Sequence, residues 1–211
     1  MKFRDRADAG NLLADRLEKA GYSPAIVLGI PRGGVVLADI VAKRLAADFD
    51  IVIPRKLGAP DNEELAIGAV MEDGTSYINR YIVNALRIPQ DYIENEKARQ
   101  AAEIRRRAAI YRKPCGYDIA GKNAILVDDG IATGATVIAS ARWARKQHPS
   151  RLIVAVPVAP PQSVEVLEQE ADFVVVLHTP RDFASVGQFY EEFDPVSDDQ
   201  VMQIMHSGGL L

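Results

Sequence analysis

Short apolar runs separated by helical patterns are the feature that most constrains how this chain can fold. The runs are rich in Ile and Val, are apolar almost without interruption, and are bounded by Gly, Pro or Asp. They cover residues 25–30, 51–53, 124–127, 152–158 and 173–177. Strands buried on both faces of a parallel sheet have this pattern, whereas strands with one exposed face alternate apolar and polar residues. We therefore expect a mostly parallel central sheet.

Helical patterns follow several of these runs. Residues 37–45 carry apolar side chains at the spacing of one helix face, residues 135–146 favour helix, and residues 160–168 can begin a helix on a proline. Alternating strands and helices predict a sheet covered by helices on both faces, with right-handed crossovers. The expected fold class is therefore α/β, with three layers.

Three segments depart from this alternation. Residues 65–78 indicate an antiparallel hairpin, because an Asp-Gly pair separates two strand-like runs. Residues 89–112 indicate a long polar helix, and the three arginines at 105–107 are typical of a solvated helix face. The first 20 residues also favour a helix, which would lie outside the alternating core.

Composition and charge exclude several classes of protein. The 211 residues, 48% of them hydrophobic, suffice for one domain with a full core, which we expect over residues 1–211. A net charge of −4 gives no general attraction for nucleic acid. No apolar run approaches the roughly 20 residues needed to span a bilayer, and the charged N-terminus lacks the apolar region of a secretory signal. The single cysteine, Cys115, has no predicted role and fits a reducing compartment. We expect a cytoplasmic protein with no membrane or nucleic-acid partner.

The sequence LVDDGIATGAT, residues 126–136, combines features that attract different ligands. Its Gly/Thr part lies between a buried strand and a helix, where unpaired backbone N–H groups and the helix dipole favour an anion. The hydroxyls of Thr133 and Thr136 can donate further hydrogen bonds. No Lys follows Gly134, so the nucleotide P-loop pattern is absent. The loop is predicted to bind phosphate.

The two acids of this stretch, Asp128 and Asp129, stand at the carboxyl end of the strand, where open α/β sheets bind their ligands. Ionised carboxylates only accept hydrogen bonds, so they suit vicinal hydroxyls or a divalent cation. Either residue alone could instead cap the following turn. Joined to the anion loop, the pair favours a ligand with a phosphate at one end and a diol nearby, such as ribose 5-phosphate.

The thirteen residues AILVDDGIATGAT, 124–136, resemble the phosphoribosyl-pyrophosphate (PRPP) motif of type I phosphoribosyltransferases. In that family the two acids hold the ribose 2′- and 3′-hydroxyls and the loop holds the 5-phosphate. The resemblance implies that Asp128 and Asp129 orient the ribose. It assigns the 5-phosphate to Ile131, Ala132, Thr133, Gly134, Ala135 and Thr136.

A second Gly-rich loop, GIPRGG at 29–34, joins the first predicted strand to a helix and is similar to the pyrophosphate loop of the same family. Its backbone N–H groups and the Arg32 guanidinium would contact a diphosphate. Family members often carry an Arg-Lys pair after the second strand, just before a mobile catalytic loop, which would start here near residues 57–61. The resemblance assigns pyrophosphate binding to Arg32, Gly33, Gly34, Arg55 and Lys56.

The last section of the chain resembles the hood in which purine transferases recognise the base. The hood would comprise roughly residues 1–22 and 178–211. Phe183, Phe189 and Tyr190 could stack on a nucleobase there. Alternatively, these rings and Phe193 could only seal the edge of the sheet, and the sequence leaves both interpretations open.

Ala132 stands where transferases for 6-oxopurines carry an Asp that is thought to assist proton transfer at the base. Alanine cannot do this, so a hypoxanthine/guanine enzyme of that mechanism is disfavoured. Family members for adenine carry Ala at this place, which does not establish adenine as the acceptor.

The resemblance implies Mg²⁺-assisted displacement of pyrophosphate from C1 of PRPP by a nitrogen of a base. The expected catalytic residues are Asp128, Asp129, Arg32 and Lys56, with the two aspartates also expected near Mg²⁺. A regulator that senses PRPP or a nucleotide with the same fold is the alternative, and a generic phosphate-binding protein is a third class. Dimers are common in the family, so a homodimer is one expectation.

Overall fold

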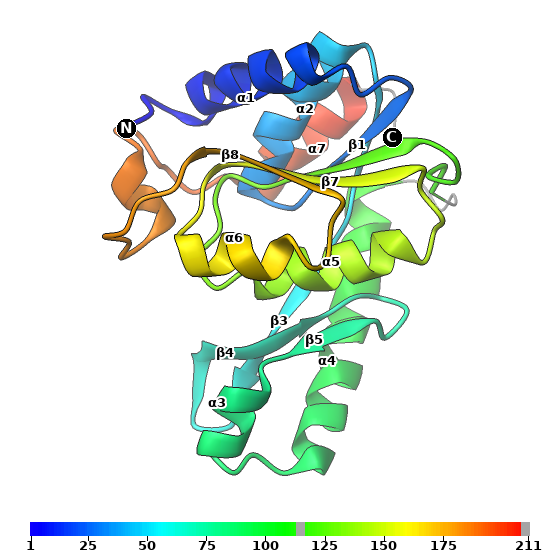
Figure 1. Ribbon diagram of the computed structural model, residues 1–211. Coiled ribbons are helices and arrows are strands. Elements are labelled where there is room, and N and C mark those ends of the chain that lie inside the picture. Colours follow the sequence, from blue (N-terminus) through cyan, green and yellow to red (C-terminus); the bar gives the residue numbers. More distant parts are fainter. Residues whose placement is uncertain (113–116, 208–211) are drawn as a thin grey trace.

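The computed structural model describes residues 1–112 and 117–207, and its centre is a parallel sheet. Five strands lie in the order β2-β1-β6-β7-β8, with every neighbouring pair parallel (Figure 1). Their bounds are β1 Ala25–Gly29, β2 Asp48–Ile51, β6 Asn123–Val127, β7 Arg151–Val158 and β8 Phe173–His178. The predicted parallel sheet is confirmed, as is the α/β fold class.

Helices cover both faces of this sheet, as Figure 1 shows. One face carries α1 (Arg6–Ala20) and α2 (Gly33–Leu45), and the other carries α5 (Ala135–Arg145) and α6 (Pro161–Leu167). Because successive strand side chains point to opposite faces, Val27 of β1 packs with α1 and α2, whereas its neighbour Leu28 packs with α5. Burial on both faces is the reason that the inner strands β1, β6 and β7 are apolar without alternation. The edge strand β2 lies at Asp48–Ile51 rather than at the predicted 51–53, because at the sheet edge its first residues are partly exposed and polar.

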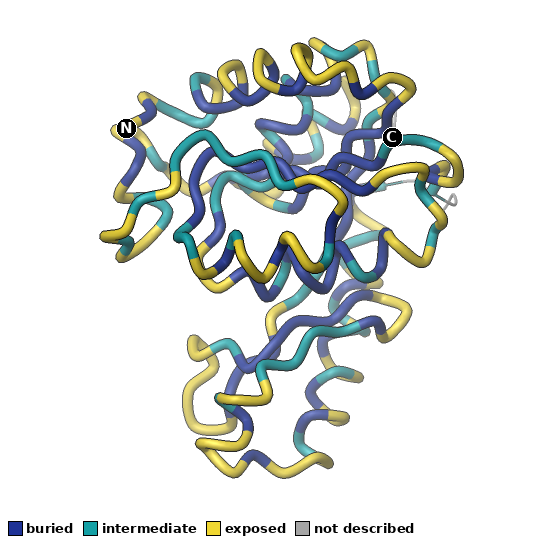
Figure 2. The backbone as a smooth tube through the Cα atoms, in the orientation of Figure 1, coloured by how far each residue is buried: buried dark blue, intermediate teal, exposed yellow. Residues whose placement is uncertain are grey.

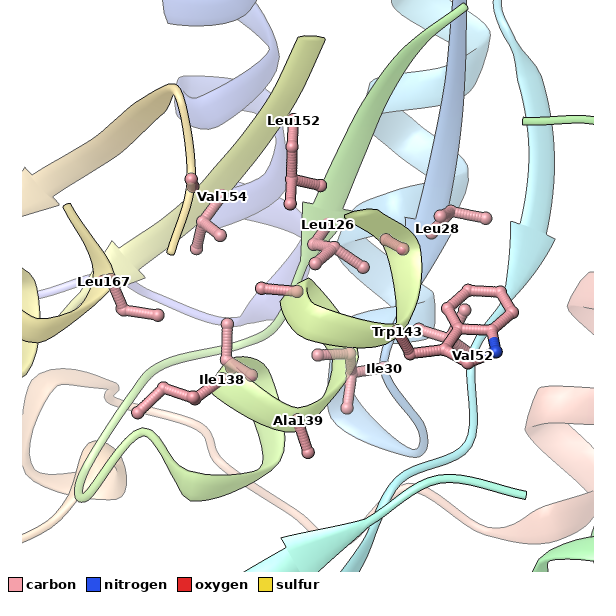
Figure 3. Close-up of a cluster of buried hydrophobic side chains, with 14 of the residues drawn as sticks. Leu28, Ile30, Val52, Leu126, Ile138, Ala139, Trp143, Leu152, Val154 and Leu167 are labelled. Atoms are coloured by element: carbon pink, nitrogen blue, oxygen red, sulfur yellow. The ribbon is translucent and has the colours of Figure 1, made fainter. Parts of the chain in front are cut away.

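The cluster beneath α5 shows how completely this layer is filled. Leu126, Leu152 and Val154 project from the sheet toward Ile138 and Trp143 of α5 (Figure 3). Trp143 is 6% exposed and makes an edge-on contact with Tyr117. Figure 2 shows the same division across the molecule, with buried strands and exposed outer turns of the helices.

A second, antiparallel sheet with the order β3-β4-β5 lies below the parallel one (Figure 1). It comprises β3 Arg55–Ala59, β4 Asn62–Val70 and β5 Ser76–Ile78. The β4-β5 pair with its Asp73-Gly74 turn confirms the predicted hairpin.

Strand β3 is a correction to the sequence analysis. Residues 57–59, expected to begin a mobile loop, are buried and paired with β4. A Cβ on Gly58 would come within 2.8 Å of the Glu63 backbone, so only glycine allows this close pairing at an irregular register. The strand is short, and its glycine and two leading cations hide it from a search for apolar runs.

Two further helices, α3 (Arg80–Ala85) and α4 (Gln90–Tyr111), follow the hairpin. The long helix predicted at 89–112 is confirmed, and β3 packs against it. Arg105 and Arg106 are exposed, and Arg106 and Arg107 both donate to Glu103 within the helix. The charge run at 105–107 therefore lies mainly on a solvated face, as predicted.

The N-terminal residues lie beside the segment that follows β8. The Phe3 N–H donates to the Phe189 carbonyl at 2.8 Å, and the Glu191 N–H donates to the Phe3 carbonyl at 2.8 Å. A 3₁₀ turn, Val186–Phe189, and a last helix, α7 (Asp198–Ser207), complete this part. None of the helices among the described residues has the length and apolar content to cross a membrane. Cys115 and the last four residues of the expected hood lie outside the described residues.

One buried ion pair joins the end of α4 to the sheet. The Arg112 guanidinium, which follows α4, donates to both carboxylate oxygens of Asp50 at the end of β2, at 3.1 and 2.6 Å. The two side chains are 9% and 8% exposed. The pair thus connects the end of α4, against which β3 packs, to strand β2 of the parallel sheet.

Asp50→Ala is expected to lower the free energy of unfolding by about 3–5 kcal/mol, because it removes the carboxylate that compensates a buried guanidinium. Asp118→Ala is the matched control. Asp118 pairs with Lys122 and its side chain is 82% exposed, so its loss should change stability by no more than about 0.5 kcal/mol. Urea unfolding followed by circular dichroism measures both, and equal effects would contradict the role given to the Asp50 pair.

Candidate active site

The candidate site is a cavity of about 410 Å³ at the carboxyl ends of β1 and β6. Residues 30–33 line it from the loop after β1, and residues 128–134 line it from the loop after β6. After β1 the chain builds β2 on one side, and the later strands lie on the other side. Such a switch point in an open parallel sheet leaves a crevice between the two loops.

The two loops are in direct contact because glycines begin α2. A Cβ on Gly33 would lie 1.8 Å from Oδ2 of Asp129, and one on Gly34 would lie 2.7 Å from the Val127 carbonyl oxygen. Any larger residue would force the loops apart. The predicted pyrophosphate loop and the predicted ribose acids are thus held side by side.

The loop after β6 is fixed by the strand and helix beside it. The Ile131 N–H donates to the Val158 carbonyl at 2.9 Å, and the Ser163 hydroxyl donates to the Ala132 carbonyl at 2.7 Å. Gly134 caps α5 with a positive φ of 77°. The first turn of α5 therefore presents its unpaired N–H groups beside Thr133 and Thr136. The predicted 5-phosphate residues line the cavity except Ala135, which is buried behind it.

Asp128 and Asp129 both lie at the cavity wall, in different surroundings. Asp128 accepts a hydrogen bond from the Asp129 N–H at 2.9 Å, and Asp129 accepts one from Nε of Arg6 at 2.8 Å. Burial raises the pKa of Asp128 well above its ordinary value, and the charge of Asp129 raises it further. Burial also raises the pKa of Asp129, while the Arg6 guanidinium opposes this shift.

Arg6 is a site residue that the sequence analysis missed. Its Nη1 donates to the Asp194 carbonyl at 2.7 Å, and its guanidinium carbon lies 3.9 Å from the centre of the Phe193 ring. The side chain is 12% exposed and lines the cavity. No signal in the sequence separates it from Arg4, which is exposed and pairs with its neighbour Asp5.

Of the predicted cations, Arg32 and Lys56 line the cavity and Arg55 does not. Arg32 is exposed, and its Nη1 lies 3.5 Å from Oδ1 of Asp198 in α7. Neighbouring residues of a strand point to opposite faces. Lys56 therefore faces the site, whereas Arg55 faces α4, where its Nε donates to Oε1 of Gln100 at 2.9 Å. This placement gives no support to pyrophosphate binding by Arg55.

The structure does not bring Phe183, Phe189 or Tyr190 into the cavity lining. Phe189 and Tyr190 are 7% and 4% exposed and pack in the core beside α1, and Phe183 stacks on Phe189. This arrangement favours the alternative in which the rings seal the edge of the sheet. Tyr190 also positions the site, because its hydroxyl donates to the Asp129 carbonyl at 2.6 Å. Phe193 does line the cavity.

The donor set limits how Mg²⁺ could be held. Carboxylate oxygens are suitable ligands, but residues 1–112 and 117–207 contain no group of three or more His, Cys, Asp or Glu able to hold a metal. The Arg6 guanidinium already occupies one oxygen of Asp129. These residues fit an ion that keeps waters and binds chiefly to ligand oxygens, as Mg²⁺ often does.

Asp128→Asn is expected to raise the melting temperature of the ligand-free protein. Because the pKa of Asp128 is raised in the fold, the ionised carboxylate destabilises the protein above that pKa, and a neutral isostere removes the penalty. Each 1 kcal/mol corresponds to about 2–4 °C for a chain of this size.

Melting temperatures of Asp128→Asn and of the unmodified protein, compared across pH, test whether ionisation of Asp128 causes the destabilisation. The gain in melting temperature from Asp128→Asn should be full above the raised pKa of Asp128, and should fade as the pH falls from that pKa toward the ordinary value of 3.8. Asp129→Asn, which breaks the Arg6 pair, is the control and should not share the rise. A rise that is independent of pH would contradict the explanation.

Comparison with known proteins gives one consistent result. A family model described as "Phosphoribosyl transferase domain" matches residues 5–192. Two putative phosphoribosyl transferases of Mycobacterium tuberculosis, from strains CDC 1551 and H37Rv, are each 41% identical to this chain over 206 residues. The alignment covers 96% of this chain and 46% of each relative, so the chain spans about half the length of these curated relatives.

Solved structures also resemble this chain. A crystal structure of TT1426 from Thermus thermophilus is 45% identical, covers 98% of this chain and 99% of its own, and has a TM-score of 0.82. A purine phosphoribosyltransferase from Pyrococcus horikoshii is 16% identical, covers 91% of this chain and 93% of its own, and has a TM-score of 0.50. That second likeness is one of fold alone.

Proposed function

The chain belongs to the type I phosphoribosyltransferase family, and we propose that it transfers the 5-phosphoribosyl group of PRPP to a nitrogenous base with release of pyrophosphate. One observation carries the proposal. The phosphate loop, the two aspartates and the second glycine loop line one cavity, with Gly33 against Asp129. A sugar with phosphates at both ends and a diol between them has complementary groups in this order.

The 5-phosphate would lie at the start of α5. Backbone N–H groups of the first turn and the hydroxyls of Thr133 and Thr136 would donate to its oxygens. The ribose hydroxyls would donate to Asp128 and Asp129. An ionised carboxylate has about four lone-pair sites, so Asp129 can accept from a hydroxyl while it still holds Arg6.

The diphosphate would lie against the start of α2, with Arg32 and Lys56 beside it. In the reaction a nitrogen lone pair of the base attacks C1, the bond from C1 to the diphosphate oxygen breaks, and its electron pair leaves with pyrophosphate. Positive charge develops on the sugar and negative charge on the leaving group, so positioning and electrostatics supply most of the catalysis.

Mg²⁺ is the proposed cofactor, and when bound it would add positive charge at the diphosphate and ribose oxygens. Asp128 and Asp129 are the residues placed to hold it, directly or through water. The pair with Arg6 leaves Asp128 as the freer of the two carboxylates.

The acceptor would lie beyond Ala132, where the lining is formed by Val186, Phe193, Pro195 and Val196. These side chains suit a flat apolar ring. None of them is an acid or a base, and Ala132 is exposed in the loop without a group that could move a proton. The same feature would suit a regulator that binds PRPP without turnover, which is the alternative function.

Pyrophosphate release from PRPP, measured with Mg²⁺ across a panel of purine, pyrimidine and pyridine bases, separates the two functions. Turnover with any base supports the transferase. Tight PRPP binding without turnover supports the sensing regulator, and equal affinities for ribose 5-phosphate and inorganic phosphate would contradict both.

Asp129→Asn is expected to weaken PRPP binding at least about tenfold, because a hydrogen bond to a charged group is worth about 1.5–3 kcal/mol. Calorimetry in the presence of Mg²⁺ measures the change. Asp118→Asn, at a side chain that is 82% exposed and outside the cavity lining, is the matched control and should bind as the unmodified protein does. Unchanged affinity in Asp129→Asn would refute the ribose assignment.

A further inference from the structure

The segment between the 3₁₀ turn and α7 contacts two arginines of the cavity lining. At its start the centre of the Phe193 ring lies 3.9 Å from the guanidinium carbon of Arg6, and the Asp194 carbonyl accepts a hydrogen bond from Nη1 of Arg6 at 2.7 Å. At its end Oδ1 of Asp198 lies 3.5 Å from Nη1 of Arg32. The contact with Arg32 places a carboxylate beside a cation that the proposed reaction needs for the diphosphate.

Asp198 is held at the start of α7, which packs against α2 and α4 (Figure 1). The helix begins with a reciprocal cap. The Gln200 N–H donates to Oγ of Ser197 at 3.2 Å, and the Ser197 N–H donates to Oε1 of Gln200 at 2.8 Å. The hydroxyl of Tyr111, a fully buried residue at the end of α4, donates to Oδ1 of Asp198 at 2.5 Å. The carboxylate is therefore anchored on the protein side, whereas Arg32 reaches it from the cavity wall.

The Asp198 carboxylate carries a negative charge at neutral pH. The hydrogen bond from Tyr111 lowers the pKa of Asp198 against the effect of burial, and the charges of Arg32 and Arg107 lower it further. Asp198 itself lies outside the cavity lining, although its partner Arg32 belongs to it. In the ligand-free protein an internal anion thus occupies the cation expected to bind a diphosphate.

The pair between Arg32 and Asp198 is loose enough to be exchanged for a ligand. Its 3.5 Å separation exceeds the roughly 2.7–2.9 Å of a good charge-assisted hydrogen bond. The two side chains are 45% and 52% exposed, so water and salt screen their attraction. A diphosphate carries more charge than one carboxylate and can bind a guanidinium fork through two oxygens. It would therefore displace Asp198 from Arg32.

We propose that Asp198 is a positioning residue that occupies Arg32 in the ligand-free protein and competes with the diphosphate for it. This role rests on the proposed function, in which Arg32 binds the diphosphate of PRPP and the pyrophosphate product. Before PRPP binds, Asp198 compensates the charge of Arg32 and keeps its side chain at the cavity wall. After the reaction Asp198 pairs with Arg32 again, which favours the release of pyrophosphate.

Asp198→Asn tests the competition, because it removes the charge and keeps an oxygen that can accept from Tyr111. Pyrophosphate is titrated by calorimetry with Mg²⁺ at low ionic strength. It is expected to bind the variant about two- to fivefold tighter, the effect of one exposed ion pair. Ribose 5-phosphate has no diphosphate and should bind both proteins equally. A merely structural role for Asp198 would change the affinities for both ligands alike.

Asp199→Asn is the matched control. Asp199 is the next residue of the first turn of α7 and is also exposed, so the substitution removes the same charge from the same helix end. This variant should bind pyrophosphate as the unmodified protein does. A second comparison uses Arg32→Gln, in which adding Asp198→Asn should no longer tighten pyrophosphate binding. Melting temperatures confirm that each variant is folded.

Four results would overturn the proposal. Pyrophosphate affinity that is unchanged or weaker in Asp198→Asn would exclude competition. An equal gain in Asp199→Asn would mean general repulsion between α7 and any anion. A gain that persists in the Arg32→Gln background would show that Asp198 does not act through Arg32. Pyrophosphate that binds neither the unmodified protein nor Asp198→Asn would remove the ligand for which the two compete.

Failure of the proposed function gives a different result. If no base supports turnover, or if ribose 5-phosphate does not bind, the transferase is contradicted. Pyrophosphate that still binds tighter to Asp198→Asn, with the gain absent from Asp199→Asn and from the Arg32→Gln background, supports the competition at Arg32 in that case as well.

Discussion

The contact between Gly33 and Asp129 is the constraint on which the rest of the site depends. Parallel pairing of β1 and β6 places Gly29 opposite Val127, so the loops that follow both strands begin at the same level. Those loops can occupy the same edge only because no Cβ stands at Gly33, where it would fall 1.8 Å from the carboxylate. The cavity, with an anion loop on each side of the aspartate pair, follows from this close approach.

The close approach of the loops also buries two adjacent negative charges, and residues from outside the alternating core compensate for them. Two adjacent carboxylates at a partly buried sheet edge repel one another and lose solvation. Arg6 of α1 supplies the opposing charge to Asp129, and Tyr190 fixes the backbone of the same residue from the segment after β8. Phe193 then covers the Arg6 guanidinium. The first helix and the segment after β8 are thus parts of the site, although both lie outside the alternating core.

Features that depend on residues close together in the sequence could be predicted, and features that depend on residues far apart in the sequence could not. The parallel sheet was predictable because a strand buried on both faces consists of consecutive apolar residues, which a single stretch of sequence shows. The loop 130–136 was predictable because a phosphate loop is built from consecutive residues. Arg6 could not be found, since it reaches Asp129 across 123 positions and nothing in the sequence separates it from the exposed Arg4. The aromatic rings of the last section could be noticed, but their burial depends on α1 and could not be foreseen.

Arg55 and Lys56 show why an error of strand assignment becomes an error of function. At the end of a parallel strand, both cations would have extended over the sheet edge toward one ligand. In the antiparallel strand β3 Lys56 lines the cavity, whereas Arg55 donates to Gln100 of α4 and does not line it. Assigning this one strand wrongly therefore changes which of two neighbouring cations is expected at the ligand.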